Sequence, residues 1–261
     1  MPGISVSGGV ESFIVKMIKL LIGDACKLDV ESNSVDLIIT HPPYLGIDTI
    51  RYGGDSSKQI NYSQDKSKML KLLKKATDEM VRVLKPGGHL VIANGRDQGL
   101  DLEYIINARK NKQLKYLDFV CQNSYSSKDT SSQNRIMSET IIIWHHFVKD
   151  GDAYYNPFIT KRYSDPVWNL PENNIDATVD TLIHRDINVI DTMNVEIPKR
   201  FIEMFTKKNA IVLDPFGGSA LVAVTAAELG RRGISNDISE DQNKAAEQRV
   251  LLTLGEKYVG S

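Results

Sequence analysis

Cysteine is scarce in this chain of 261 residues, which contains only Cys26 and Cys121. The two are far apart, and neither belongs to a CxxC or Cys/His pattern. Such spacing argues against a disulfide scaffold and against a zinc site, so we expect no bound metal. A phosphate loop of the form Gly-x-x-x-x-Gly-Lys-Ser/Thr is also lacking, which leaves nucleotide triphosphate hydrolysis without support.

Long apolar runs and a strong charge imbalance are lacking too. No run approaches the roughly 20 apolar residues that a membrane span needs. Residues 1–9 are small and polar and do not show the basic-then-apolar order of a secretory signal, so we expect a cytoplasmic protein. The formal net charge is −1, which by itself does not indicate a nucleic-acid partner. Basic residues cluster within 66–75 and 109–115, where solvated helix faces or loops are the simplest interpretation.

What the sequence does contain is a regular alternation of apolar runs with helix-like stretches. Hydrophobic residues make up 41% and charged residues 25%, as in ordinary globular proteins. The alternation predicts an α/β fold, doubly wound, with a mostly parallel sheet and helices on both faces. Seven strands are expected at 18–22, 35–39, 89–93, 115–121, 139–147, 210–213 and 232–235. Helices are expected at 66–84, 100–111, 197–206, 219–229 and 240–252.

One segment, residues 150–185, interrupts this pattern. It contains Pro157, Pro166 and Pro171 among Tyr, Asn and Asp residues and has no clear period. Irregular surface segments often carry specificity. We therefore predict a single domain over 1–261, in which 150–185 is an inserted recognition segment.

A glycine-bearing turn follows the expected strand 210–213 and opens the next helix. The turn is Asp214-Pro215-Phe216-Gly217-Gly218-Ser219. Glycine lets the backbone approach a ligand closely, and the Asp214 carboxylate accepts hydrogen bonds. About twenty residues later Asp237 ends the next strand, where an acid commonly holds the ribose hydroxyls of an adenosine cofactor. The alternatives are an ordinary tight turn and, for Asp237, a residue at a helix N-terminus.

A rigid corner, His41-Pro42-Pro43-Tyr44, follows the expected strand 35–39. Because the two prolines fix the backbone, the groups at this corner are held in place. An earlier strand, 18–22, is followed by another acid, Asp24.

The order and content of these motifs resemble the permuted, beta class of DNA amino-methyltransferases, which modify adenine N6 or cytosine N4. In that class an Asp/Asn/Ser-Pro-Pro-Tyr corner precedes an Asp-Pro-Phe-x-Gly-Ser turn, then Ala-Ala-x-x-x-Gly-Arg and an acid. Here Ala226-Ala227-Glu228-Leu229-Gly230-Arg231 precedes Asp237. The resemblance covers about 18–93 and 197–249. It implies a circularly permuted Rossmann-like sheet, S-adenosyl-L-methionine as cofactor and double-stranded DNA as partner.

The resemblance also implies a role for each motif. A sulfonium methyl is already electrophilic, so the enzyme has to position the amine of a flipped base rather than activate it with a metal. The His41 side chain and the Pro42 carbonyl would accept its N–H groups, with Pro43 fixing the corner and Tyr44 stacking on the base. The implied cofactor-binding residues are Asp24, Ala25, Pro198, Asp214, Pro215, Phe216, Gly217, Gly218, Ser219, Asp237 and Ile238. Neither cysteine follows a proline, as the attacking cysteine does in carbon-5 cytosine methyltransferases.

Two departures from the class limit what the sequence decides. His41 stands where the class has Asp, Asn or Ser, and imidazole accepts a hydrogen bond only while neutral. Ala220-Leu221-Val222 replaces Gly-Thr-Thr after Ser219. Adenine N6 and cytosine N4 therefore both stay open, although residues 44–48 faintly resemble cytosine-type members. A catalytically impaired, nucleic-acid-binding partner subunit and an RNA methyltransferase stay open as well, as do a homodimer and a restriction endonuclease partner.

Overall fold

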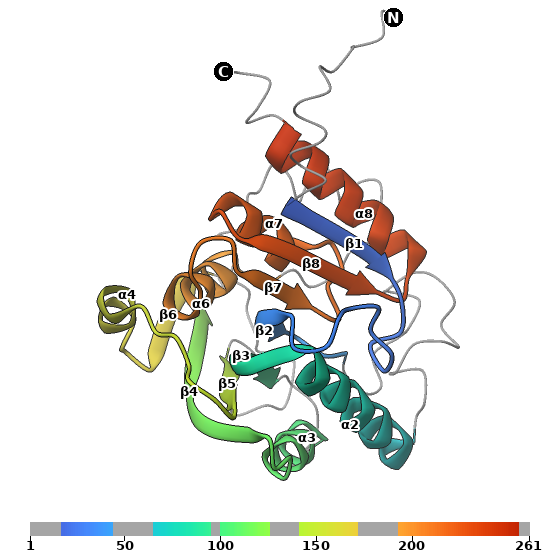
Figure 1. The fold of residues 1–261 in the computed structure, drawn as a ribbon, viewed down its shortest axis with the longest axis vertical. Coiled ribbons are helices and arrows are strands. Elements are labelled where there is room, and N and C mark those ends of the chain that lie inside the picture. Colours follow the sequence, from blue (N-terminus) through green and yellow to red (C-terminus); the bar gives the residue numbers. More distant parts are fainter. Residues whose placement is uncertain (1–16, 44–64, 95–99, 126–140, 172–192, 256–261) are drawn as a thin grey trace, which may run out of the picture.

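The computed structural model describes residues 17–43, 65–94, 100–125, 141–171 and 193–255. Within them, one sheet of eight strands has the order β1-β8-β7-β2-β3-β5-β4-β6 (Figure 1). The strands are β1 (Ile18–Ile22), β2 (Val35–Thr40), β3 (Leu84–Asn94), β4 (Leu114–Tyr125), β5 (Ile141–Lys149), β6 (Val167–Pro171), β7 (Ile211–Asp214) and β8 (Arg232–Asp237). The helices are α2 (Lys66–Val83), α3 (Leu100–Arg109), α4 (Pro157–Arg162), α6 (Glu196–Phe205), α7 (Leu221–Glu228) and α8 (Glu240–Val250), which continues as a π-helical turn (Leu251–Gly255).

Central strand β2 shows why the sheet is covered on both faces. It is continuously apolar from Leu37 to Ile39, as expected of a parallel strand buried on both sides. Successive side chains alternate between faces, so Ile38 packs in the cluster that α2 and α3 cover, while Leu37 and Ile39 pack in the cluster under α6. Helix α8 lies along β1 and β8 (Figure 1). The expected doubly wound α/β fold is confirmed.

The strand directions bring seven strand ends to one edge of the sheet. β1, β8, β7, β2 and β3 are parallel neighbours, and β5 is antiparallel to both β3 and β4. Because β6 is parallel to β4, β5 alone runs in the opposite direction among the described strands. The segments that follow β1, β8, β7 and β2 therefore lie along the same carboxyl edge, which is where ligands bind in open α/β sheets.

Two details differ from the sequence-based expectation. The sheet has eight described strands instead of seven, and the segment expected to be irregular contains a short helix at Pro157–Arg162 and a strand at Val167–Pro171. Helix α4 begins after Asn156, whose side chain accepts a hydrogen bond from the Ile159 N–H. Strand β6 then pairs with β4 and extends the sheet. This pairing joins residues about 45 positions apart, so no local period in the sequence reveals it.

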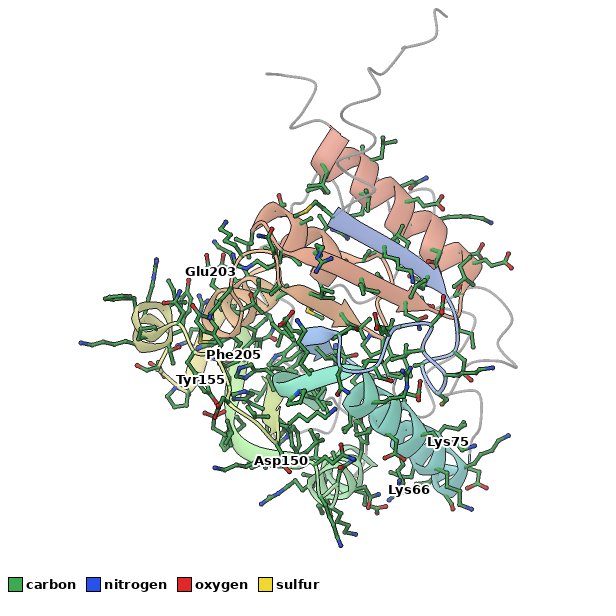
Figure 2. The ribbon with its side chains drawn as sticks, in the orientation of Figure 1. Lys66, Lys75, Asp150, Tyr155, Glu203 and Phe205 are labelled. Carbon is green, nitrogen blue, oxygen red and sulfur yellow. The ribbon has the colours of Figure 1, made fainter. Side chains whose placement is uncertain are left out.

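Histidines on β3 and β5 lie away from that carboxyl edge. His146 Nδ1 is 2.9 Å from Asp118 Oδ1, and its Nε2 is 2.9 Å from His89 Nδ1. Burial and the neighbouring His146 lower the pKa of His89 to about 3. Both rings stack on Phe205, which also meets Tyr155 (Figure 2). These histidines serve packing, and they are separate from His41.

The basic cluster within 66–75 lies on α2, where its five lysines are exposed; Lys66 and Lys75 are labelled in Figure 2.

Among the described residues, no helix is both long and apolar enough to cross a membrane.

Candidate functional site

A row of hydrogen bonds joins the carboxyl ends of four adjacent strands and the loops that follow two of them. The Gly23 N–H after β1 donates to the Asp237 carbonyl at the end of β8, at 2.9 Å. The Gly217 N–H after β7 donates to the Asn236 carbonyl, at 2.8 Å. At the end of β2, Thr40 Oγ1 donates to Asp214 Oδ1 at 2.9 Å. The residues that the sequence singled out are therefore physically connected, although they are far apart along the chain.

The turn between β7 and α7 is closely packed on the end of β8. A Cβ atom on Gly217 would lie 2.0 Å from Ser235 Oγ, so only glycine fits there. Gly218 has a φ of 49° and Ala220 a φ of 62°, both in the left-handed region. For an alanine this conformation costs roughly 1–2 kcal/mol. The strained Ala220 stands where the class that the sequence resembles has glycine.

Asp214 is a buried carboxyl group beside this turn, with 3% of its surface exposed. Burial, with a smaller contribution from the nearby Asp237 carboxylate, raises its pKa to about 7, although hydrogen bonds from the Phe216 N–H and Thr40 Oγ1 act in the opposite direction. Asp214 thus titrates close to neutral pH, at the junction of the glycine turn and the proline corner.

Asp237 holds the glycine turn through its carboxylate. Its Oδ2 accepts the Gly218 N–H at 3.0 Å and its Oδ1 accepts the Ser239 N–H at 2.8 Å. Burial raises its pKa. Ser239 is the N-cap of α8 and accepts the Gln242 N–H, so Asp237 lies at the helix N-terminus, two residues before the cap.

The proline corner begins directly after Thr40. Pro42 is buried and Pro43 is half-buried, while Tyr44 lies outside the described residues. The His41 ring is tilted against the Trp144 ring of β5, with 5.9 Å between the two centroids. His41 therefore lies between the hydrogen-bonded row and an aromatic side chain.

The remaining predicted residues lie around the same edge. Asp24 is exposed, and its Oδ1 accepts the Cys26 N–H at 2.8 Å, while Ala25 is buried. Ile238 follows Asp237 directly. Pro198 is buried in α6, which packs against β2 and α7. Since α6 leads into the amino end of β7, its N-terminal turn points toward the carboxyl edge.

Sequence reasoning missed four residues that shape the site: Thr40, Trp144, Asn236 and Arg249. Arg249 Nε donates to the Ser219 carbonyl at 2.9 Å and its Nη2 donates to Ser219 Oγ at 3.1 Å. Thr40 and Asn236 each lie next to a predicted site residue in the sequence, so their position could have indicated a role in the site. Nothing in the sequence indicates such a role for Trp144 and Arg249, because only folding brings them near the site.

The donor and acceptor set fits an organic ligand better than a metal. No group of three or more His, Cys, Asp or Glu able to hold a metal ion occurs in the described part of the chain. None of the described lysines or arginines forms an ion pair with Asp214 or Asp237. One buried and one half-buried carboxyl group beside a glycine turn suit a ligand that offers hydroxyl donors and positive charge.

Known proteins match this chain over most of its length. A family model described as DNA methylase, for N6 and N4 methyltransferases, matches residues 35–248. The methylase YubD of Escherichia coli (strain K12) is 28% identical over 221 residues, covering 84% of this chain and 82% of that protein. The type II methyltransferase M.BamHI of Bacillus amyloliquefaciens is 27% identical over 249 residues, covering 87% of this chain and 56% of that protein.

Solved structures share the fold. The cytosine-N4-specific PvuII DNA methyltransferase superposes with a TM-score of 0.72 at 15% identity, covering 94% of this chain and 93% of that one. The complex of M1.HpyAVI with S-adenosylmethionine gives a TM-score of 0.64 at 18% identity, covering 90% and 99%.

Proposed function

The chain belongs to the DNA methylase family of N6 and N4 methyltransferases and uses S-adenosyl-L-methionine to methylate DNA, and from this premise we propose which residues do so and on which base. The acceptor we propose is an exocyclic amino group of a flipped base within a short sequence. The observation that supports this most is the hydrogen-bonded row that connects the glycine turn to the proline corner through Asp214 and Thr40.

For the cofactor, we propose the residues around the carboxyl ends of β1, β8 and β7. S-adenosyl-L-methionine supplies a methyl group already activated by its sulfonium charge. The Asp237 carboxylate has unused lone pairs for ribose hydroxyls, and the Asp214 carboxylate would counter positive charge. The other proposed residues are Asp24, Ala25, Pro198, Pro215, Phe216, Gly217, Gly218, Ser219 and Ile238.

For the amine, we propose the corner at His41. An exocyclic amine is a poor nucleophile because its lone pair is delocalised into the ring. Acceptors that engage both N–H groups favour a more tetrahedral nitrogen and fix its direction of attack. The neutral His41 ring and the Pro42 carbonyl would be these acceptors, Pro43 would keep the corner rigid, and Tyr44 would stack on the base.

For target recognition, we propose the segment 150–185 within a single domain over 1–261. Its strand β6 extends the sheet and ends at the same edge as β2. Between the two bases, residues 44–48 faintly support cytosine N4 over adenine N6.

Expression in cells that lack DNA methyltransferases tests this function. Mass spectrometry of digested genomic DNA should detect N4-methylcytosine or N6-methyladenine, and cells with empty vector should contain neither. Digested RNA from the same cells serves as the control for the alternative substrate. Methylated adenine or cytosine in RNA alone would replace the DNA proposal, and no product in either would favour the impaired partner subunit.

The pKa of Asp214 predicts how cofactor binding depends on pH. A cationic cofactor beside this carboxyl favours its ionised form, so binding should release a proton when the free protein carries Asp214 protonated. Affinity for S-adenosyl-L-methionine should then fall as pH falls through about 7, by up to about tenfold per pH unit. Calorimetry between pH 6 and 8, in two buffers of different ionisation enthalpy, measures both effects. In Asp214→Asn the affinity should depend much less on pH. If the wild type bound the cofactor equally well at pH 6 and pH 8, the prediction would be wrong.

A further inference from the structure

Asn236 is the penultimate residue of β8, the strand that lies between β1 and β7. Its side chain is buried, with 1% of the residue exposed. Its Nδ2 donates to the Gly23 carbonyl and to the Pro215 carbonyl, each at 3.0 Å. One side-chain amide thus uses both of its N–H groups to join the loop after β1 to the loop after β7.

The two acceptors define the residue type that this position needs. Both are backbone carbonyls, so the side chain must present two donors on one short stem, and the Asn amide does so. An aspartate would direct a carboxylate at two carbonyl oxygens, and a leucine would offer no donor to the buried Pro215 carbonyl or to the partly buried Gly23 carbonyl. The fit extends to Gly23, because a Cβ there would lie 2.8 Å from Asn236 Oδ1.

The side chains on either side of Asn236 both contact the glycine turn. Ser235 packs beneath Gly217, and the Asp237 side chain accepts the Gly218 N–H. Both side chains act on the glycine turn. Of these three side chains, only that of Asn236 donates hydrogen bonds to both the turn and the β1 loop, in addition to the backbone bonds from the Gly23 and Gly217 N–H groups to β8.

We propose that Asn236 is a positioning residue that fixes the spacing between the β1 loop and the glycine turn, and thereby the affinity for S-adenosyl-L-methionine. This inference rests on the proposed function, in which Asp24 and Ala25 bind the cofactor from one loop and residues 215–219 bind it from the other. Asn236 lies beneath these loops and does not reach the amine corner. Its loss should therefore change cofactor affinity and leave the chemical step largely intact.

The first test compares Asn236→Leu and Asn236→Asp with the wild type by calorimetry and steady-state kinetics. Both variants should bind S-adenosyl-L-methionine about 10- to 100-fold more weakly at pH 8, the size of losing two hydrogen bonds. The KM for the cofactor should rise in parallel, while kcat at saturating cofactor and the affinity for DNA stay within about threefold. Wild-type affinity in both variants, or a loss in kcat without a change in KM, would overturn the proposal.

The second readout is one that a general packing defect would not give. The carboxyl group introduced by Asn236→Asp can donate one of the two hydrogen bonds once it is protonated. The affinity of this variant should therefore approach that of the wild type as pH falls from 8 to 5.5. The ratio of its Kd to that of the wild type should shrink, while the ratio for Asn236→Leu stays constant. Equal pH dependence of the two ratios would count against the hydrogen-bonding role.

A further variant covers the case in which the Asn236 variants do not fold. Gly23→Ala pushes against Oδ1 from the other side and should also weaken cofactor binding, and a folded Gly23→Ala protein with wild-type affinity would overturn the inference. The proposed function is checked separately by the wild type. If the wild type does not bind the cofactor, the proposed function is wrong. If the wild type binds it and the variants bind it equally well, only the positioning role of Asn236 is wrong.

Discussion

Replacing His41 with alanine should lower the turnover number for methyl transfer by about 10²- to 10³-fold, the size found for removing one preorganised hydrogen-bond partner at a reacting group. The ring follows buried Thr40 and lies against Trp144, so its direction is set before a base arrives. Alanine removes the acceptor and leaves the Pro42 carbonyl as the only one proposed. Turnover measured at saturating cofactor and DNA tests this.

Cofactor affinity is the internal control, because His41 is not among the residues proposed to bind the cofactor. It should stay within about threefold of the wild type in His41→Ala. His41→Asn should retain most activity, since an amide oxygen also accepts hydrogen bonds.

Two outcomes would revise the role of the corner. Unchanged turnover in His41→Ala would make the corner structural. An inactive wild type that becomes active as His41→Asp or His41→Asn would instead identify the chain as an impaired member of its family, in which the histidine itself removed catalysis.

Replacing Gly217 with alanine should weaken cofactor binding by about 10- to 100-fold, because an overpacking strain of about 1–3 kcal/mol is relieved only when the turn leaves the position in which it would bind the ligand. The added Cβ would lie 2.0 Å from Ser235 Oγ, 3.0 Å from its Cβ and 3.3 Å from its Cα. Since Ser235 is buried in β8, the turn has to move away from the strand. Overpacking of this kind also costs about 1–3 kcal/mol of stability.

A graded rescue distinguishes this collision from a general loss of flexibility. In the Gly217→Ala background, Ser235→Ala removes the Oγ atom that lies closest to the added Cβ, and Ser235→Gly removes the Ser235 Cβ as well. Cofactor affinity should therefore recover partly with Ser235→Ala and further with Ser235→Gly. Gly218→Ala is the matched comparison, because its Cβ would come no closer than 3.6 Å to Gln242 Oε1 and its cost comes from the φ of 49°. Calorimetry and thermal unfolding measure both effects; wild-type affinity in Gly217→Ala alone would contradict the prediction.

The sequence revealed elements whose cause is local. A run such as Val35–Thr40 is largely apolar, and its continuous stretch from Leu37 to Ile39 predicts a strand buried on both faces. The turn at residues 214–219 and the acid at Asp237 follow such strands directly, so their positions at strand ends were predictable. Their convergence on one edge was predictable too, because neighbouring parallel strands end at the same side of a sheet.

Elements whose cause is distant stayed hidden. The segment 150–171 was expected to be irregular, yet β6 pairs with β4 about 45 positions away. Because this pairing is not visible in the sequence, seven strands were expected, whereas the described residues form eight. The N-cap of α8 is Ser239. Asp237, two residues earlier, is also a polar residue that can accept hydrogen bonds from a helix N-terminus, so the sequence did not distinguish the two.

By itself, therefore, the sequence determined the fold class, the order of the two motifs and the family they resemble, because each depends on residue types within a few positions of one another. The tertiary structure decided the partners. Thr40 donates to Asp214 across 174 positions, and Asn236 joins Gly23 to Pro215 across 213 and 21. A polar side chain has many acceptors available in the unfolded chain, and only the packed sheet leaves it one set within hydrogen-bonding distance.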